Sequence, residues 1–371
     1  MARHRQFGIV ATLAAACLAA CAPTTTYPRP TPTTSPSLSP APTSTLPPAT
    51  STPAYPISAA FWDAQHGLLI LTPGCMSSDN TCPGGVIERT DDAGKTWHQV
   101  DRTSASLSAI ALSGNGGAWV SESGSGCGAG GNCTASTFLL TSDGGTTWAD
   151  VSSRTPVDSV APVSATTAWA LAGSPGSPDV GTALVRTADG GRTWQPHVDP
   201  CSRVSGVGPA TVSFAGPAHG WLVCSGVPAT DMQPKALFST HDGGTTWQLQ
   251  SDTCLGSVTG QPVRSVGRLS CVGNTEEMSA LPDGHGWMWM NRGSLSTTTN
   301  GGVTWSAIAA NIVTDDINDA LSVSLVSDAD GFLLISKPES QTGCTPLNCG
   351  PQLLSTNNGG RTWTIMSIWS P

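Results

Sequence analysis

The sequence is poor in charge. Only 11% of its 371 residues are Asp, Glu, Lys or Arg, against roughly 25% in a typical soluble domain. Lysine is scarce, and without Arg3 and Arg5 near the N-terminus 14 basic residues stand against 25 acidic ones, a net charge of −11. A weakly charged, acidic chain argues against nucleic acid as a partner and against electrostatic binding to anionic lipid.

Stretches with the 3.6-residue hydrophobic period of an amphipathic helix are missing as well. The chain has instead short apolar segments separated by turn formers, with 42 Gly, 29 Pro and 13 Trp in all. Apolar segments of this length between turn signals are typical of β-strands. The pattern therefore predicts an all-β fold.

The apolar run Phe7–Ala20 is too short to cross a bilayer. It follows two arginines, which is typical of a signal peptide over residues 1–20. The run ends in Leu18-Ala19-Ala20-Cys21, which resembles the bacterial lipobox. The resemblance implies diacylglycerol and palmitate-type acyl chains on Cys21, enough for a stable anchor on the extracytoplasmic face of the cell membrane. Ordinary cleavage near Ala20, with Cys21 incidental, is the alternative.

Residues 21–56 begin at this cysteine and continue almost wholly in Pro, Thr, Ser and Ala. Such a segment cannot bury a core and favours polyproline II, which at ~3.1 Å per residue reaches on the order of 100 Å. It is interpreted as a stalk or a passive linker before a domain at 57–371.

Cys-x-x-Cys spacing is absent, which argues against zinc in an exported protein. Setting aside Cys17 and Cys21 leaves ten cysteines, an even number that predicts disulfides. Three local bridges are expected between the second and third strands of their units: Cys75–Cys82, Cys127–Cys133 and Cys344–Cys349. Sequence order suggests Cys201–Cys224 and Cys254–Cys271 for the rest, and the other pairings of these four stay open.

One motif, T-x-[DN]-x-G-x-T-W, occurs six times at spacings of 46 to 58 residues, which is typical of a propeller or solenoid. The copies are Thr90–Trp97, Thr141–Trp148, Thr187–Trp194, Thr240–Trp247, Thr298–Trp305 and Thr356–Trp363. The third position accepts hydrogen bonds from backbone amides of a tight turn. It is occupied by Asp92, Asp143, Asp189, Asp242, Asn300 and Asn358. The following glycine supplies positive φ, and Thr-Trp returns the chain into a strand.

The six copies resemble the Asp-box, or BNR repeat, of sialidases and related β-propellers. In that family the box is structural and lies away from the active site, so the resemblance implies that these acids are not catalytic. The same repeats also resemble non-catalytic propellers, including the photosystem II assembly factors.

A strand, a short turn and a small residue with an aromatic precede each box, as in Phe214–Trp221. Each unit then reads as four strands, A to D, with A–B and C–D turns on one face of a propeller. Six blades result, and a seventh hidden in 248–280 is the alternative. The A–B turns carry histidines in three different blades, which predicts turn residues and no metal site: His66, His219 and His285.

The B–C and D–A connections of such a propeller share the other face and vary in length, which is typical of a binding surface. The insertion 251–277 is the longest, and its Arg264 and Arg268 are candidates for binding a carboxylate or an acidic glycan. Solvated ion pairs with nearby acids are the alternative.

Sialidases use a nucleophilic tyrosine, whereas both tyrosines here, Tyr27 and Tyr55, are expected in the stalk. The resemblance therefore does not extend to sialidase activity. A glycosidase with two carboxylates needs only a suitable pair of acids. The candidates near the starts of A strands are Asp158, Glu276, Glu277, Asp315, Asp316 and Asp319.

Together these features predict a lipid-anchored, monomeric propeller without cofactor or metal. We expect a non-catalytic binding or assembly module whose ligand is a protein or a glycan, with a hydrolase of unknown specificity as the alternative. Glu277 and Asp319 join the two arginines as candidate binding residues.

Overall fold

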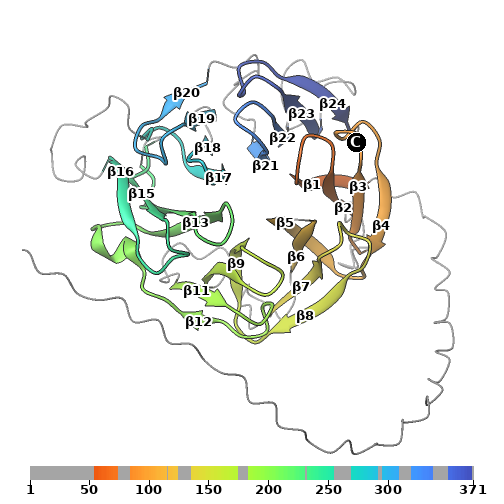
Figure 1. Cartoon of the computed structure of the whole chain (residues 1–371), viewed down its shortest axis with the longest axis horizontal. Helices are drawn as coiled ribbons and strands as arrows, with labels where there is room; N and C mark the ends of the chain where they lie inside the picture. The colour runs from red at the N-terminus through yellow and green to blue at the C-terminus, as the bar shows by residue number, and fades with distance from the viewer. Residues whose placement is uncertain are drawn as a thin grey trace, which may run out of the picture. The chain divides into compact units, whose positions relative to one another are not determined.

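The chain folds as a six-bladed β-propeller. The computed structural model describes residues 54–73, 84–114, 116–123, 135–173, 183–229, 232–254, 269–290, 295–308, 319–336 and 350–369. They form six four-stranded antiparallel sheets arranged in a ring (Figure 1). The prediction of an all-β propeller with six blades is confirmed. The described part has one helical element, the 3-10 helix η1 (Pro200–Arg203). Among the described residues we find no helix with the length and hydrophobicity of a membrane span.

Each blade is one continuous stretch of chain, because the strand order in every sheet follows the sequence. The first three blades are β1 (Ala54–Phe61), β2 (Gly67–Pro73), β3 (Val86–Thr90), β4 (His98–Arg102); β5 (Ser106–Gly114), β6 (Gly117–Ser123), β7 (Ser136–Thr141), β8 (Ala149–Ser153); and β9 (Val157–Pro162), β10 (Ala168–Ala172), β11 (Ala183–Thr187), β12 (Gln195–Pro196). The last three are β13 (Gly208–Phe214), β14 (Gly220–Ser225), β15 (Lys235–Thr240), β16 (Gln248–Thr253); β17 (Thr275–Ala280), β18 (Gly286–Met290), β19 (Leu295–Thr298), β20 (Ser306–Ala307); and β21 (Asp319–Leu325), β22 (Gly331–Ser336), β23 (Gln352–Thr356), β24 (Thr364–Ile368).

The propeller begins earlier than the sequence suggested. Strand β1 starts at Ala54, three residues before Ile57, and Tyr55 pairs with Thr72 of β2. The expectation that both tyrosines lie in the stalk is therefore wrong for Tyr55. The proline-rich composition up to Pro56 hid this start, although the first strand of a blade tolerates proline at its beginning.

The hydrophobic core is divided into six clusters, one at each junction between neighbouring blades. The aromatic residue that follows the A–B turn is a main component of most of them. Trp169, for example, is 1% exposed and packs with Phe214 and Trp247 of the next blade. Because each sheet buries both faces against its neighbours, stability arises from contacts between blades as well as within them.

The glycine of each T-x-[DN]-x-G-x-T-W segment, hereafter the repeat turn, is required for two reasons. Gly244 has φ of +85°, which L side chains rarely adopt, and a Cβ there would collide with the indole of Trp169 in the preceding blade. Gly191 stands in the same relation to Trp119. The repeat turn therefore joins consecutive blades.

The ring closes without exchanging a strand between its ends. Strand β1 lies against β21, and the amides of Ala59 and Phe61 donate hydrogen bonds to Ser322 Oγ and Ser324 Oγ over 3.0 and 3.3 Å. The Phe61 and Phe332 rings stack with centroids 3.6 Å apart. Closure thus rests on the same kind of packing as the other junctions.

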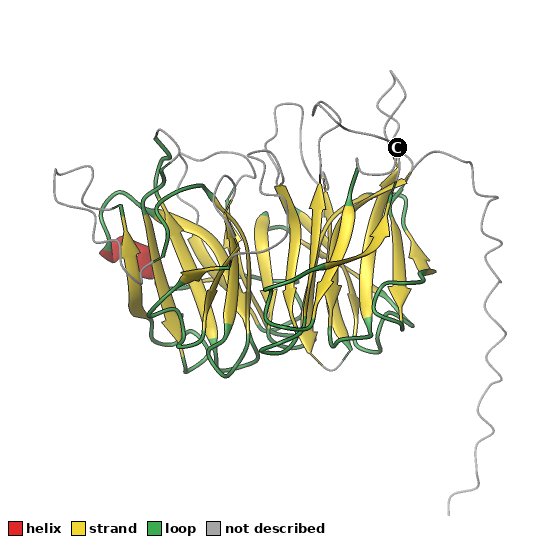
Figure 2. Ribbon diagram, turned by 90° about the horizontal axis from the view of Figure 1, so that it is seen from above, coloured by secondary structure: helices red, strands yellow, loops and turns green. Residues whose placement is uncertain are grey.

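Viewed from the side, the strands run between two faces of the ring (Figure 2). The short A–B turns and the repeat turns share one face, which we call the repeat-turn face. The B–C and D–A connections start and end on the other, which we call the loop face. This arrangement follows from the antiparallel order of four strands per blade.

Candidate binding site

The first and third residues of each repeat turn direct their side-chain hydrogen bonds into the turn itself. In blade 2, the buried Thr141 Oγ1 donates to Asp143 Oδ1 over 2.8 Å and accepts from the Gly145 amide over 3.0 Å. The Asp143 carboxylate also accepts from the amide and hydroxyl of Thr147 over 2.9 and 2.7 Å. The three other aspartate turns repeat this pattern. In the two asparagine turns, Asn300 and Asn358 accept in the same way from the first threonine, but their Nδ2 groups donate to the hydroxyls of Thr304 and Thr362.

These bonds lower the pKa of the repeat-turn aspartates. The hydroxyl of Thr147 and then its amide hold the pKa of Asp143 at about 2, and Asp92, Asp189 and Asp242 behave alike. A carboxylate kept ionised by several donors is unsuited to proton transfer near neutral pH. The repeat-turn aspartates are therefore poor candidates for a general acid or base.

The innermost strands surround a central channel of about 690 Å³. Each contains an irregularity of register near its loop-face end, such as that between Pro56 and Ser58 in β1 or between Ala320 and Ser322 in β21. Bulges bend a strand and re-aim its side chains. Serine hydroxyls beside them bond the next blade; Ser58 Oγ accepts from the Ile110 amide over 3.2 Å.

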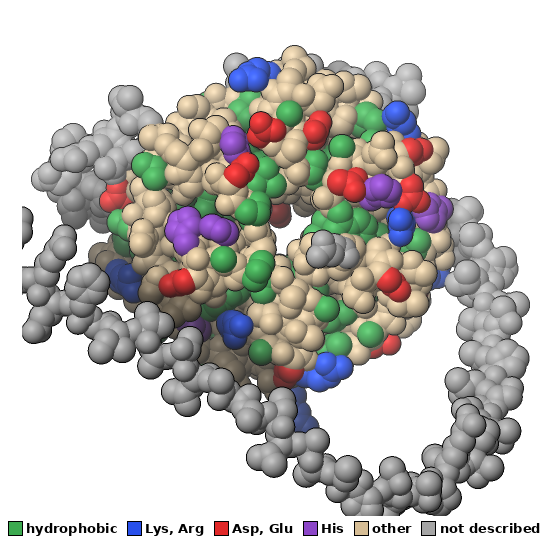
Figure 3. Space-filling view, viewed as in Figure 1, with side chains coloured by type: hydrophobic (Ala, Val, Ile, Leu, Met, Phe, Trp, Pro, Cys, Tyr) green, Lys and Arg blue, Asp and Glu red, His purple; other side chains and the backbone are tan. Residues whose placement is uncertain are grey.

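The channel wall consists mainly of small and hydroxyl-bearing residues. The hydroxyl groups that line it include those of Ser58, Ser108, Ser121, Ser136, Thr137, Ser159, Thr211, Ser213, Ser279, Ser322 and Ser324. The space-filling view shows the ring hollowed at its centre, with charged side chains scattered around the visible face (Figure 3). Alanine and serine at the innermost positions leave this space open because larger side chains would fill it.

Three carboxylates of the described residues line the channel, and all three lie near the loop face. Asp158 and Glu277 are near the starts of the inner strands β9 and β17, and Glu122 is near the end of β6. The described residues that line the channel include no Lys, Arg or His. This end of the channel is therefore a region of acceptor groups and hydroxyls.

Glu122 was not among the acids that the sequence singled out. Burial raises its pKa, the Thr103 hydroxyl opposes this by donating over 3.1 Å, and the nearby charge of Asp150 raises it further. Asp150 also acts on Asp101 of the neighbouring blade, whose pKa burial raises. Glu122 falls at the end of a B strand, so only knowledge of the strand register could have placed it at the channel.

Some of the other residues that the sequence singled out lie in described strands, and the rest lie outside the described residues. Asp319 opens β21, at the loop-face end of an inner strand, and Glu276 lies in β17 beside Glu277. Asp315, Asp316, Arg264 and Arg268 lie outside the described residues. Tyr55, now part of β1, is not among the residues lining the channel, which include no tyrosine in the described part.

Two disulfides brace the loop face of blade 4. Cys201 of η1 bonds Cys224 of β14, and Cys254 bonds Cys271. The pairing that sequence order suggested is therefore confirmed for these four cysteines. Both bridges involve a D–A connection, so they stabilise the links between blades.

The three local bridges predicted within B–C connections are not confirmed. Cys75 and Cys82 fall between β2 and β3, in a part of the chain that lies outside the described residues. The same holds for Cys127 and Cys133 between β6 and β7, and for Cys344 and Cys349 between β22 and β23. Pairing of these six cysteines remains a prediction from the sequence.

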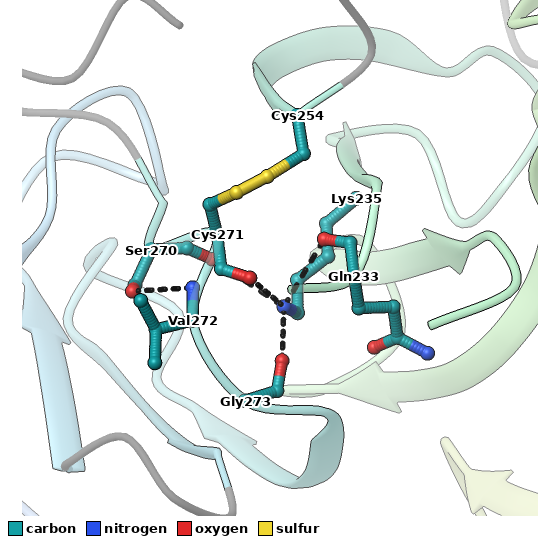
Figure 4. The surroundings of a disulfide bond; sticks show 7 residues. All are labelled: Gln233, Lys235, Cys254, Ser270, Cys271, Val272 and Gly273. Atoms are coloured by element: carbon teal, nitrogen blue, oxygen red, sulfur yellow. Dashed lines mark hydrogen bonds between the residues drawn. A yellow bond between two sulfur atoms is a disulfide. The ribbon is translucent and has the colours of Figure 1, made fainter. Parts of the chain in front are cut away.

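Lys235 strengthens the base of the 251–277 insertion (Figure 4). Its side chain is buried, and the Nζ group donates to Gly273 O over 2.6 Å. Longer contacts of 3.4 to 3.5 Å reach the carbonyls of Gln233, Ser270 and Cys271. Burial lowers the pKa of Lys235 to about 8. Lys235 thus connects the end of the insertion to β15. Lysine is rare in this sequence, and that rarity was the available sign that Lys235 has a structural role.

The three turn histidines have different partners in their different blades. His66 Nδ1 lies 2.9 Å from Asp63, and His285 Nδ1 lies 3.0 Å from Asp283. His219 instead meets His241, a repeat-turn residue that the sequence interpretation had not considered. Among the described residues no group of three or more His, Cys, Asp or Glu side chains could hold a metal ion.

No protein-family model matches the chain, and no curated protein matches it either. The likeness to solved structures is one of fold. An α-L-arabinanase of Penicillium chrysogenum, solved with arabinobiose, is 14% identical with a TM-score of 0.51, over 83% of this chain and 93% of that one.

YCF48 of Cyanidioschyzon merolae is 16% identical with a TM-score of 0.45, over 85% of this chain and 86% of that one. A structure of YCF48 bound to a D1 peptide is 18% identical with a TM-score of 0.40, over 85% and 82%. At 14% identity, the likeness to the arabinanase shows the fold alone, and the class that the structure defines is the β-propeller.

Proposed function

We propose that this protein is a lipid-anchored, extracytoplasmic β-propeller that binds a protein or glycan at the loop-face end of its channel without altering it chemically. The observation that carries the proposal is the convergence of Glu122, Asp158 and Glu277, from three blades, on a channel rich in hydroxyls. Such a surface offers hydrogen bonds to the hydroxyls of a glycan and charge-assisted bonds to cationic groups of a peptide.

The repeat turns are Asp-box turns with a structural role in this proposal. The side chains of their acids bond within the turn, and the turns lie on the face opposite the acids of the channel. The proposed binding surface includes the 251–277 insertion, whose described ends are joined by the Cys254–Cys271 bridge and contacted by Lys235. Arg264 and Arg268 of the insertion would contact a carboxylate of the ligand.

A binding screen of the full chain on glycan and peptide arrays tests the proposal. Asp158→Asn and Glu277→Gln should each weaken a verified ligand several-fold, and Asp328→Asn, an exposed acid on the repeat-turn face, should leave the affinity unchanged. The pair Arg264→Ala and Arg268→Ala is compared with Arg192→Ala and Arg361→Ala on the repeat-turn face. Loss of binding only in the repeat-turn-face variants would contradict the proposed surface.

The anchor is tested separately with Cys21→Ala. The thiol of Cys21 is the acceptor of the lipid, so this variant should leave the membrane and accumulate in the medium. Detergent partitioning equal to that of the wild type would exclude an anchor at Cys21.

A glycosidase is the second candidate, because Asp158 and Glu277 line the same channel. Two carboxylates flanking one cavity are what glycoside hydrolysis requires. If the protein hydrolyses a glycan identified on the array, Asp158→Asn or Glu277→Gln should abolish turnover while binding persists. Intact glycans after prolonged incubation with the wild type would exclude this activity for those glycans.

A further inference from the structure

We propose that His219 and His241 form a binding site for a divalent transition-metal ion on the repeat-turn face of blade 4. The two Nδ1 atoms lie 3.0 Å apart, and the rings meet edge to face with their planes at 81°. His219 belongs to the A–B turn and His241 is the second residue of the repeat turn. The Gly243 amide donates to Ala218 O over 2.9 Å, which holds the two turns together.

The separation of the nitrogens suits a shared metal ion. With metal–nitrogen bonds of 2.0–2.1 Å, neighbouring ligands are about 2.9 Å apart at right angles and about 3.3 Å apart in a tetrahedron. The observed 3.0 Å falls between these values, and the His241 ring is exposed while that of His219 is half-buried. Neutral imidazole is a good ligand for Zn²⁺, Ni²⁺ and Cu²⁺.

The other turn histidines lack this arrangement. Asp63 holds Nδ1 of His66, and Asp283 lies beside Nδ1 of His285. Residue 216 in the A–B turn of blade 4 is glycine, at the place of Asp63 in blade 1. The carboxylate of Asp242, next to His241, accepts from Thr240 and Thr246. His219 and His241 are thus left facing each other, and water would complete the coordination of a metal bound by two protein ligands.

Isothermal titration of the oxidised full chain with Zn²⁺ and with Ni²⁺ tests the site. The wild type should bind one equivalent more than His219→Ala or His241→Ala. The matched controls His66→Ala and His285→Ala, in the same turn of other blades, should bind as the wild type does. This comparison removes contributions from the remaining histidines and from the N-terminus.

A thermal melt gives the second measurement. Metal should raise the Tm of the wild type, because it binds the folded state, and this rise should vanish in both blade-4 variants. Without metal the variants should melt close to the wild type, since both side chains are at the surface. Equal stoichiometry and equal Tm shifts in the wild type and the two variants would mean that the two histidines hold no metal ion, and would overturn the proposal.

Discussion

At the residue scale, the threonine that opens each repeat turn should contribute more to stability than the Asp or Asn at the third position. Thr141 is buried, whereas Asp143 is exposed. The threonine hydroxyl accepts from the amide of the buried Gly145 over 3.0 Å. Asp143 accepts hydrogen bonds from the amides of Thr146 and Thr147, which are exposed residues. The stability of the turn should therefore depend more on the threonine.

We expect Thr141→Val to lower the free energy of unfolding by about 1–3 kcal/mol, the cost of leaving a buried amide unpaired. Valine keeps the shape and β-branching of threonine, so the loss isolates the hydroxyl. Thr146→Val, at an exposed position of the same turn, should change stability by less than about 0.5 kcal/mol. Urea unfolding of both variants provides the measurement, and equal losses would contradict the assigned role.

The lowered pKa of the repeat-turn aspartates predicts a specific acid sensitivity. Their folded-state pKa of about 2 lies below the unfolded value near 3.8. They therefore contribute stability above pH ~4, and this contribution is lost as the pH falls toward 2. Asparagine cannot titrate, and Asn300 already supports the same turn, accepting from the Thr304 amide over 2.9 Å.

The quadruple variant Asp92→Asn, Asp143→Asn, Asp189→Asn and Asp242→Asn should therefore lose less stability than the wild type between pH 4 and pH 2. Thermal melts across this range measure the slope. Parallel slopes for the two proteins would show that other carboxylates dominate acid unfolding.

At the element scale, the two described disulfides restrain the connections of blade 4. Cys201 and Cys224 are fully buried in the cluster that contains Trp169, and they enclose a separation of 23 residues. The Cys254–Cys271 bridge encloses 17 residues and lies beside Val272, which is exposed. Loops of these lengths imply similar restraint of the unfolded chain, about 3 kcal/mol each.

We expect the double variant Cys201→Ala/Cys224→Ala to be less stable than Cys254→Ala/Cys271→Ala. The first variant also removes sulfur atoms from a packed core and leaves a cavity, whereas the second mainly releases the base of the insertion. Guanidinium unfolding of the two double variants decides the comparison. A greater loss in the second variant would show that the insertion contributes to the core.

The three local bridges within B–C connections are a separate prediction. Peptide mass mapping of the unreduced protein should find Cys82 linked to Cys75, and Cys349 linked to Cys344. Cys127 should likewise be linked to Cys133. Loops this short restrain the unfolded chain by roughly 2–3 kcal/mol at best, so the fold should tolerate the loss of any one of them. A free thiol at any of these six positions would contradict the predicted set of five disulfides.

At the scale of the whole molecule, the ring has one junction that joins distant parts of the chain. Blade 1 meets blade 6 through β1 and β21, and Ser367 Oγ donates to Gly94 O over 2.7 Å. The other five junctions join blades adjacent in sequence. Closing the ring therefore brings together residues 263 positions apart, which costs more entropy than closing a junction between neighbours.

Ser322→Ala and Ser324→Ala should each destabilise the fold by about 1–3 kcal/mol, because they leave the amides of Ala59 and Phe61 unpaired at this junction. Ser279→Ala is the matched control, since Ser279 Oγ accepts from the Leu325 amide over 2.9 Å at an ordinary junction. Hydrogen exchange should show faster opening of β1 in the closure variants only. Unchanged exchange of β1 would indicate that aromatic packing alone closes the ring.

The number of blades and the position of each turn could be predicted from the sequence by itself. A repeat turn is a local structure: Thr141, Asp143 and Gly145 interact within five residues, so their order in the chain already contains the geometry. Four strands per unit and the two faces of the ring follow from counting such turns. The start of β1 was misplaced because proline-rich composition does not distinguish a stalk from the first strand of a blade.

Only the tertiary structure decided which side chains meet. Asp158 and Glu277 come from blades 3 and 5, and the bulges of β9 and β17 set the direction of their side chains. Since a shift of one residue moves a side chain to the opposite face of a strand, sequence spacing could not place Glu122 at the channel. The same holds for His219 and His241, which a hydrogen bond between two turns brings within 3.0 Å. Local hydrogen bonds therefore determine the architecture of this protein, whereas register and closure of the ring determine its surfaces.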